Sequence, residues 1–175
     1  MPTALIVFIA LTVAGLLIHL LCMRILAWRG VTVRRTKFGL TLLFDTADDD
    51  GTPVRMLNVN GAFQSVAYAT DELWSELACE YQREQARIVS ELPRLSRAAV
   101  IGGGGFSFPK WLVVHLPPVA VSVVEIDEKI IDIARESFGL ARLEREYAGY
   151  GGASSLPATT AGRGCAARSV PSTSS

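Results

Sequence analysis

The sequence predicts an α/β protein attached to a membrane by one helix, and three features of the chain carry this prediction. An uncharged apolar run lies near the amino terminus, and strand-like segments separated by tight turns follow it. The second half has the order strand, glycine turn, helix, strand, which is typical of parallel sheets. We therefore expect an anchor over residues 1–29, a β-hairpin unit over 34–70, a partial α/β domain over 71–147 and a disordered tail over 148–175.

The composition excludes two classes of function. The 17 basic and 17 acidic residues balance, so the chain lacks the positive surplus expected of a nucleic-acid-binding protein. The three cysteines, Cys22, Cys79 and Cys165, form no CxxC pair, and two histidines are too few for most metal clusters. We therefore expect no metal site and no nucleic-acid partner.

The segment from Thr3 to Met23 contains no Asp, Glu, Lys or Arg. About 20 helical residues cross the hydrocarbon core of a bilayer, so this segment is long enough to span it. A cleaved signal peptide is the alternative, but it would have a basic start, a shorter apolar core and a small-residue cleavage site. This chain has an uncharged start, and Arg24, Trp28 and Arg29 follow the run. We favour a retained single-pass anchor.

The charges after the anchor predict its orientation. Basic residues that follow a span stay on the cytoplasmic side, so we expect the rest of the chain to be cytoplasmic, at the cell membrane. His19 is the one titratable group within the run, and we expect it near an interface or against a partner helix. The basic residues are Arg24, Arg29, Arg34, Arg35 and Lys37.

A small antiparallel β unit is predicted next. Asn60-Gly61 between two strand-like runs is a strong hairpin signal, because a type I′ turn needs positive φ at both central residues. Asp48 to Gly51 forms the preceding turn. The expected strands are Gly39–Thr46, Arg55–Val59 and Phe63–Tyr68.

A helix is predicted after this unit. Asp71 is positioned to cap it, and the helical pattern extends to about Leu92. Apolar residues recur at helical spacing and should face the core. They are Leu73, Leu77, Tyr81, Ile88 and Leu92.

The second half of the chain predicts a βαβ unit. A short apolar strand runs directly into four glycines, Gly102, Gly103, Gly104 and Gly105. A helix over Phe106–His115 leads to a strongly apolar strand over Val119–Ile126, and a second helix runs from Glu128 to Gly139. The second strand ends in Glu125, with Asp127 two residues later. Two parallel strands alone would leave one face of their sheet poorly covered.

This order of elements predicts a nucleotide-type, Rossmann-like site. Glycines let the backbone approach a ligand closely, and an acid at the next strand end can accept both hydrogen bonds of a ribose diol. A phosphate-binding loop is disfavoured, because Lys110 follows Pro109 and no Gly-Lys-Ser/Thr is present. The dinucleotide fingerprint fits in part, since Ser107 occupies its third glycine position. An S-adenosyl ligand, which has no phosphates, suits the loop, and a tight turn without a ligand is the alternative.

The residues that form this unit resemble a known family. Val100 to Lys110 (VIGGGGFSFPK), Val123 to Phe138 (VVEIDEKIIDIARESF) and Asn60 to Ser65 (NGAFQS) resemble the membrane-attached bacterial spermidine synthases. The resemblance implies aminopropyl transfer from decarboxylated S-adenosylmethionine to a polyamine or other small amine, and it leaves a homodimer open. It implies that Gly102 to Gly105 line the ligand, that Glu125 holds the ribose with Asp127 beside it, and that Gln64 lies near the ligand or amine entrance.

The chain also departs from that family. Gly105 and Phe106 stand where the family carries an Asp among the glycines, and no Tyr-His pair lies around Trp74. The later catalytic Asp, which would orient and deprotonate the amine, has no counterpart. The alternatives are therefore a methyltransferase that uses S-adenosylmethionine and a non-catalytic membrane-anchored remnant. The Gly-, Ala-, Ser- and Thr-rich tail suggests a truncated or frameshifted reading frame.

Overall fold

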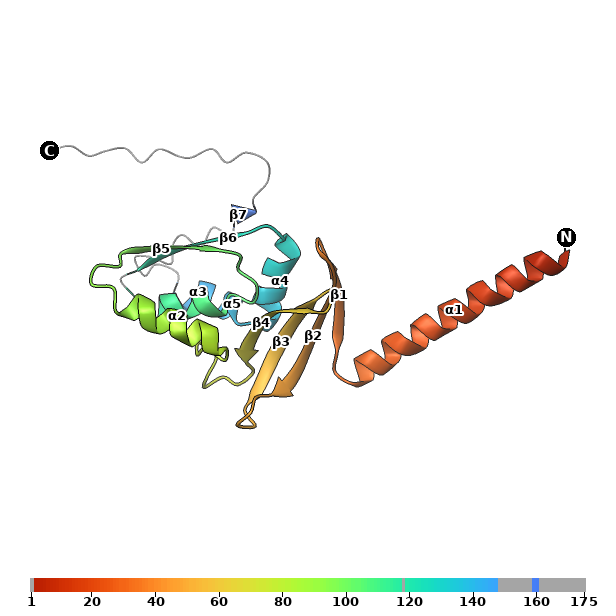
Figure 1. Cartoon of the computed structure of the whole chain (residues 1–175), viewed down its shortest axis with the longest axis horizontal. Helices are drawn as coiled ribbons and strands as arrows, with labels where there is room; N and C mark the ends of the chain where they lie inside the picture. The colour runs from red at the N-terminus through yellow and green to blue at the C-terminus, as the bar shows by residue number, and fades with distance from the viewer. Residues whose placement is uncertain (1, 118, 148–158, 161–175) are drawn as a thin grey trace.

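The structure, a computed structural model, describes residues 2–117, 119–147 and 159–160. Its body is built from an antiparallel sheet of four strands and a parallel sheet, with helices between them (Figure 1). The elements in chain order are α1 (Pro2–Trp28), β1 (Thr32–Thr36), β2 (Gly39–Ala47), β3 (Pro53–Val59), β4 (Ala62–Tyr68), α2 (Glu80–Ser90), β5 (Arg97–Ile101), α3 (Ser107–His115), β6 (Ala120–Glu125), α4 (Glu128–Ser137), α5 (Leu140–Glu146) and β7 (Thr159–Thr160).

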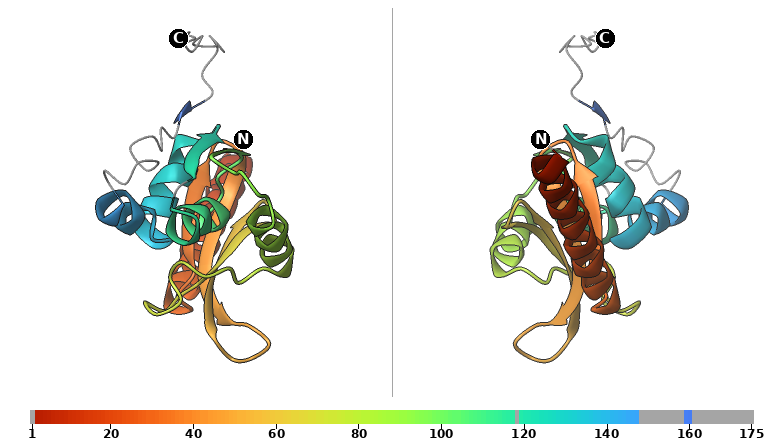
Figure 2. Two further views of the ribbon diagram at one scale, coloured as in Figure 1. Left: turned by 90° about the vertical axis from the view of Figure 1, so that its left-hand side faces the viewer. Right: turned by 90° about the vertical axis from the view of Figure 1, so that its right-hand side faces the viewer.

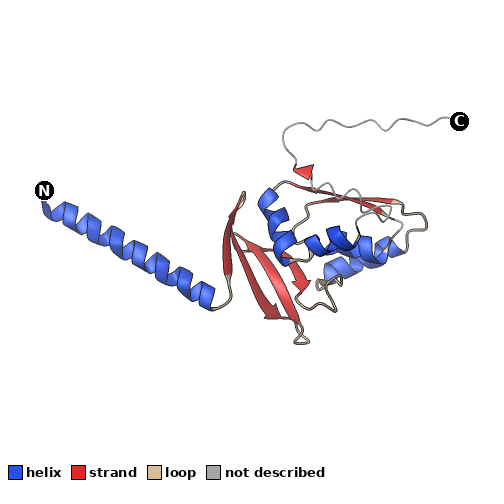
Figure 3. Ribbon diagram, turned by 180° about the vertical axis from the view of Figure 1, so that it is seen from behind, coloured by secondary structure: helices blue, strands red, loops and turns tan. Residues whose placement is uncertain are grey.

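The predicted anchor forms one straight helix, α1, which projects away from the body of the molecule (Figures 1 and 3). Its apolar stretch from Thr3 to Trp28 is long enough to cross a membrane by length and composition, a test that a signal sequence also passes. The large apolar side chains along it are exposed, as expected for a helix that has no protein around it.

The antiparallel sheet has the strand order β1-β2-β3-β4. The predicted hairpin is confirmed, because Asn60 and Gly61 both have positive φ, 51° and 85°, as a type I′ turn requires. The sequence interpretation missed β1, which contains only β-branched and basic residues and pairs with β2 from Thr32↔Leu43 to Thr36↔Gly39. Figures 1 and 2 show α2, α4 and α5 on the same face of this sheet, with α2 toward one edge and α4 and α5 toward the other.

The predicted parallel pair is also present, with β5 and β6 in register from Arg97↔Ala120 to Ile101↔Val124. The helices lie on one side of this sheet (Figures 1 and 3). Inward residues such as Val121 and Val123 are buried, whereas Ile101 is 90% exposed and Val124 is 40% exposed. The expectation of one poorly covered face is confirmed for the described residues.

Helix α4 joins the two sheets because two of its faces are apolar. Ile131 and Ala134 pack into a core with β6, α3 and α5. Ile130 and Ile133 pack instead against Leu43 and Leu57 of the antiparallel sheet, together with Phe138. Fully burying such a side chain stabilises the fold by about 1.5–3 kcal/mol, so α4 contributes to both cores at once.

The prediction of a helix capped by Asp71 was wrong. The chain from Asp71 to Cys79 forms turns and bends, and α2 begins only at Glu80. Gln82 and Ala86 face the interior, while Tyr81, Ile88 and Leu92 of the predicted core stripe are 57%, 55% and 49% exposed. Leu77, from the turn segment, is buried as expected.

The chain after Gly139 also differs from the sequence interpretation, which had no helix there. Gly139 has a φ of 77°, ends the predicted helix and begins α5, whose Leu140 and Leu143 are buried. The predicted disordered tail lies outside the described residues except for Thr159–Thr160. These two residues form β7, parallel to the end of β6.

A buried lysine fastens α3 to the corner between α4 and α5. Lys110 is 2% exposed, and its Nζ donates a 3.0 Å hydrogen bond to the carbonyl of Phe138. The same nitrogen lies 5.6 Å from the ring centre of Trp74, whose ring is also contacted by Arg142. Burial, with a smaller effect of the Arg142 charge, lowers the pKa of Lys110 from its usual 10.5 to about 8.

This lowered pKa predicts how stability depends on pH. Between pH 8 and 10.5 the unfolded chain binds more protons at Lys110 than the folded chain, so stability rises with pH by up to about 1.4 kcal/mol per pH unit. Burial raises the pKa values of Cys79 and Tyr81 above their usual 9.0 and 10.0, which gives the opposite slope at higher pH. Chemical denaturation at pH 8 and 9 should show the rise for the native chain and its loss in Lys110→Met. Equal slopes for the two proteins would contradict the assignment.

Candidate functional site

The glycine loop lies between the end of β5 and the start of α3, and it packs against β4 of the antiparallel sheet. Gly102 and Gly104 have φ values of 84° and 51°, which favour glycine. A side chain at Gly105 would collide with Ser65 Oγ of β4 at 2.6 Å. Ser107 Oγ donates a 3.0 Å hydrogen bond to the carbonyl of Val66, so β4 fixes the end of the loop that leads into α3.

The side chain of Phe106 explains why the loop has a glycine at position 103. Phe106 has a backbone φ of 58°, its N–H donates to the carbonyl of Gly103 at 2.7 Å, and its side chain is 1% exposed. A side chain at Gly103 would collide with the Phe106 ring. The loop therefore closes over an aromatic ring that belongs to the core.

Glu125, at the end of β6, binds the backbone of the loop through its carboxylate. One oxygen, Oε2, accepts hydrogen bonds from the N–H groups of Gly103 and Gly104, at 2.8 and 3.2 Å. The other, Oε1, accepts from those of Ile126 and Asp127, at 2.8 and 3.0 Å. A carboxylate has about four acceptor positions, so backbone donors occupy them all, and the side chain is only 6% exposed.

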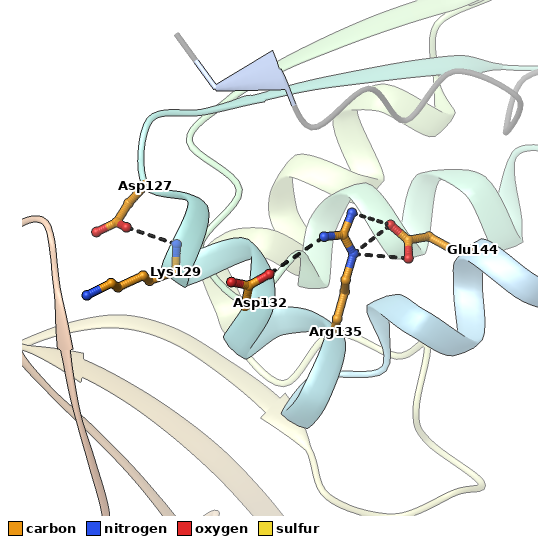
Figure 4. A network of polar contacts seen from close by, with 5 residues as sticks. All are labelled: Asp127, Lys129, Asp132, Arg135 and Glu144. Carbon is orange, nitrogen blue, oxygen red and sulfur yellow. Dashed lines mark hydrogen bonds and ion pairs between the residues drawn. The ribbon is translucent and has the colours of Figure 1, made fainter. Parts of the chain in front are cut away.

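Asp127 has a different role from the one predicted. Its Oδ1 accepts a 3.0 Å hydrogen bond from the Lys129 N–H and caps α4, as Figure 4 shows. Its Oδ2 accepts a 2.5 Å hydrogen bond from the Lys37 N–H of the β1–β2 turn. Asp127 therefore joins α4 to the antiparallel sheet. Further along α4, Arg135 pairs with Asp132 and with Glu144 of α5 (Figure 4).

A pocket of about 900 Å³ opens at the carboxyl ends of β5 and β6. The glycine loop and Glu125 form one wall, the antiparallel sheet forms a second, and α2 forms a third. Ligands of open parallel sheets bind in this position. The polar side chains of the lining are Asn60, Gln64, Ser65, Tyr81, Gln82, Gln85 and Glu125.

The charge of this pocket is distinctive. Among the described residues that line it, Glu125 is the one with a charged side chain, and there is no Lys, Arg or His. A phosphate buried there would have no cation to pair with, which is costly. The pocket is therefore suited to a neutral or cationic ligand.

The structure brings together five of the seven predicted site residues, because Gly102, Gly103, Gly104, Glu125 and Gln64 all line the pocket. Gly105 packs against Ser65 and Asp127 caps α4, so neither is among the lining residues. Sequence reasoning missed Phe38, Asn60, Tyr81, Gln82 and Gln85, since their place depends on how the sheet and α2 pack around the loop. No group of three or more His, Cys, Asp or Glu that could hold a metal ion occurs within the described residues.

No family model and no curated protein matches the sequence. Among solved structures, the chain is similar to a probable spermidine synthase from Corynebacterium glutamicum ATCC 13032, with a TM-score of 0.44 and 20% identity. The similarity covers 60% of this chain and 38% of that one, so the chain spans well under half of its length.

The bonding of Glu125 predicts that Glu125→Gln destabilises the protein. The amide nitrogen cannot accept hydrogen bonds, so two of the four backbone N–H groups lose their acceptor. The free energy of unfolding should fall by about 1–3 kcal/mol. Chemical denaturation followed by tryptophan fluorescence measures this, with the exposed Glu72→Gln as the matched control. A Glu125→Gln protein as stable as the control would show that these hydrogen bonds do not hold the loop.

Proposed function

We propose that this chain is a membrane-anchored, Rossmann-like protein that binds an S-adenosyl nucleoside, of the decarboxylated S-adenosylmethionine type, in the pocket between the glycine loop and the antiparallel sheet. The observation that carries the proposal is the pocket's charge: one carboxylate, Glu125, and no basic side chain among the described lining residues. A sulfonium nucleoside has a positive charge and no phosphate, so it complements this lining.

The lining also favours the decarboxylated co-substrate over S-adenosylmethionine itself. S-adenosylmethionine has an α-carboxylate, which would need a donor or cation in the pocket. Decarboxylated S-adenosylmethionine replaces this part with an aminopropyl group that ends in an ammonium. The neutral amides of Gln64, Gln82 and Gln85 can accept hydrogen bonds from such a group.

Glu125 would bind the ribose. Each ribose hydroxyl can donate a hydrogen bond to a carboxylate oxygen. Because backbone donors already fill the four acceptor positions, one bond must be exchanged on binding. The bond from Gly104, at 3.2 Å, is the longest of the four and the one that a ribose hydroxyl would replace.

The reaction proposed for this site is aminopropyl transfer. The nitrogen of an acceptor amine attacks the propyl carbon bonded to the sulfonium, a C–N bond forms and the C–S bond breaks. The electron pair of the broken bond goes to sulfur, which leaves as the neutral thioether 5′-methylthioadenosine, and the amine proton passes to a base. The chain's contribution is to hold the two reactants in line within the pocket.

A second candidate is binding without turnover, and one observation favours it. Deprotonating the amine needs a base beside it, and Glu125 is the one carboxylate among the described lining residues. That carboxylate is committed to the loop. A protein that holds the nucleoside at the membrane without transferring its aminopropyl group fits the same geometry.

Insertion of α1 into the cell membrane completes the proposal. The helix is long and apolar enough to span a bilayer, and the cations that follow it favour a cytoplasmic body. The pocket would then lie on the cytoplasmic side.

Binding to the full chain in detergent tests the proposal by isothermal calorimetry. We expect decarboxylated S-adenosylmethionine to bind at least about tenfold more tightly than S-adenosylmethionine, because the pocket offers its carboxylate no cation. Adenosine diphosphate is the control ligand and should not bind.

Equal affinity for all three ligands, or no binding by a chain shown to be folded, would contradict the proposal. Product analysis with an added polyamine then separates the two candidates. Formation of 5′-methylthioadenosine indicates transfer, and tight binding without product indicates the second candidate.

A further inference from the structure

The junction between α1 and the body carries a concentration of positive charge. The first 44 residues contain five basic side chains and no Asp or Glu. Of these five side chains, Arg34 forms an ion pair within the described part of the chain, at 3.3 Å from Glu136. The other four, Arg24, Arg29, Arg35 and Lys37, are exposed and have no carboxylate within ion-pair distance in the described part of the chain.

The connection from α1 to β1 is short and fixed. Gly30, with a φ of 73°, ends the helix, its N–H donates to Ala27 at 3.0 Å, and the Val31 N–H donates to Leu26 at 2.9 Å. These bonds form a Schellman cap, which determines the direction of the chain as it leaves the helix. Three residues separate α1 from β1, and they span at most roughly 10 Å. If α1 spans a bilayer, β1 must therefore begin close to its surface.

The turn that follows β1 presents further groups suited to that surface. Lys37 and Phe38 are exposed, and Phe38 is 53% exposed despite its aromatic ring. The backbone of this edge is held by α4, since Lys37 N–H donates to Asp127 and Lys129 Nζ donates to the Arg35 carbonyl at 3.0 Å. Hydrogen bonds therefore fix the backbone at Arg35 and Lys37, while the side chains of these two residues are exposed to solvent.

We propose that a basic edge, formed by Arg24, Arg29, Arg35, Lys37 and Phe38, binds the anionic headgroups of the bilayer that α1 spans. Cations near an anionic membrane surface are attracted to it, and an aromatic ring suits the interface. Phe38 also lines the ligand pocket, so this contact places one rim of the pocket against the membrane. The inference rests on the insertion of α1, which is part of the proposed function.

The experiment uses the full chain in lipid nanodiscs, of phosphatidylcholine alone or with phosphatidylglycerol. Amide hydrogen exchange is measured over residues 37–39. Each cation near an anionic surface contributes about fivefold to the binding constant, so we expect at least about fivefold slower exchange in the anionic discs. Salt at about 1 M, where the Debye length is roughly 3 Å, should remove the difference.

Two matched variants identify the side chains responsible. Arg35→Gln/Lys37→Gln removes two charges from the basic edge but keeps the hydrogen bonds to Asp127 and Lys129, which involve backbone atoms. It should lose the difference between the two lipids. Arg94→Gln/Arg97→Gln removes two exposed charges from the loop before β5 and the first residue of β5, and should retain the difference.

The outcomes separate this inference from the proposed function. A chain that does not co-purify with the nanodisc contradicts the insertion of α1 and overturns the docking with it, whereas nucleoside binding can still be measured in detergent. A chain that is incorporated but exchanges equally in both lipids overturns the docking alone. Equal loss of the lipid effect in the two double variants also overturns it, because the effect would then follow net charge.

Discussion

The Glu125 carboxylate, bonded to four backbone N–H groups, connects the parts of this protein that its pocket depends on. Two of the donors belong to the glycine loop after β5, and two belong to the turn between β6 and α4. The N–H of Asp127 is one of these donors, while its own carboxylate accepts from the β1–β2 turn. A chain of hydrogen bonds therefore runs from the antiparallel sheet to the loop through two carboxylates.

Packing supports the same connection. Helix α4 places Ile131 in one core and Ile130 in the other, so the two sheets cannot shift independently around the pocket. Lys110 fixes the far end of α4 through the Phe138 carbonyl. The face of β5 and β6 that points away from the helices is uncovered, and its exposed Ile101, at the end of β5, also lines the pocket. A stable wall for a ligand can thus exist beside a sheet that is covered on one face.

The sequence predicted the elements whose signals are local. Asn60-Gly61 determines a turn through backbone φ, and the glycine run followed by Glu125 predicts the strand ends at which the pocket lies. Features set by packing between distant segments were missed: β1 needs β2 as its partner, and α2 buries Gln82 and Ala86 while Tyr81 and Ile88 stay exposed. Asp127 shows the same limit, because an acid at a strand end can bind a ligand or cap the next helix, and only its neighbours decide between them.

The most direct test of this account is the affinity of the full chain for 5′-methylthioadenosine and for its 2′,3′-dideoxy counterpart. The two ligands share the base and the thioether and differ only in the ribose hydroxyls. If Glu125 binds the ribose, the dideoxy compound loses hydrogen bonds to a charged acceptor, and its affinity should be at least about tenfold weaker. Equal affinities would show that the carboxylate serves the loop alone and that the pocket recognises its ligand in another way.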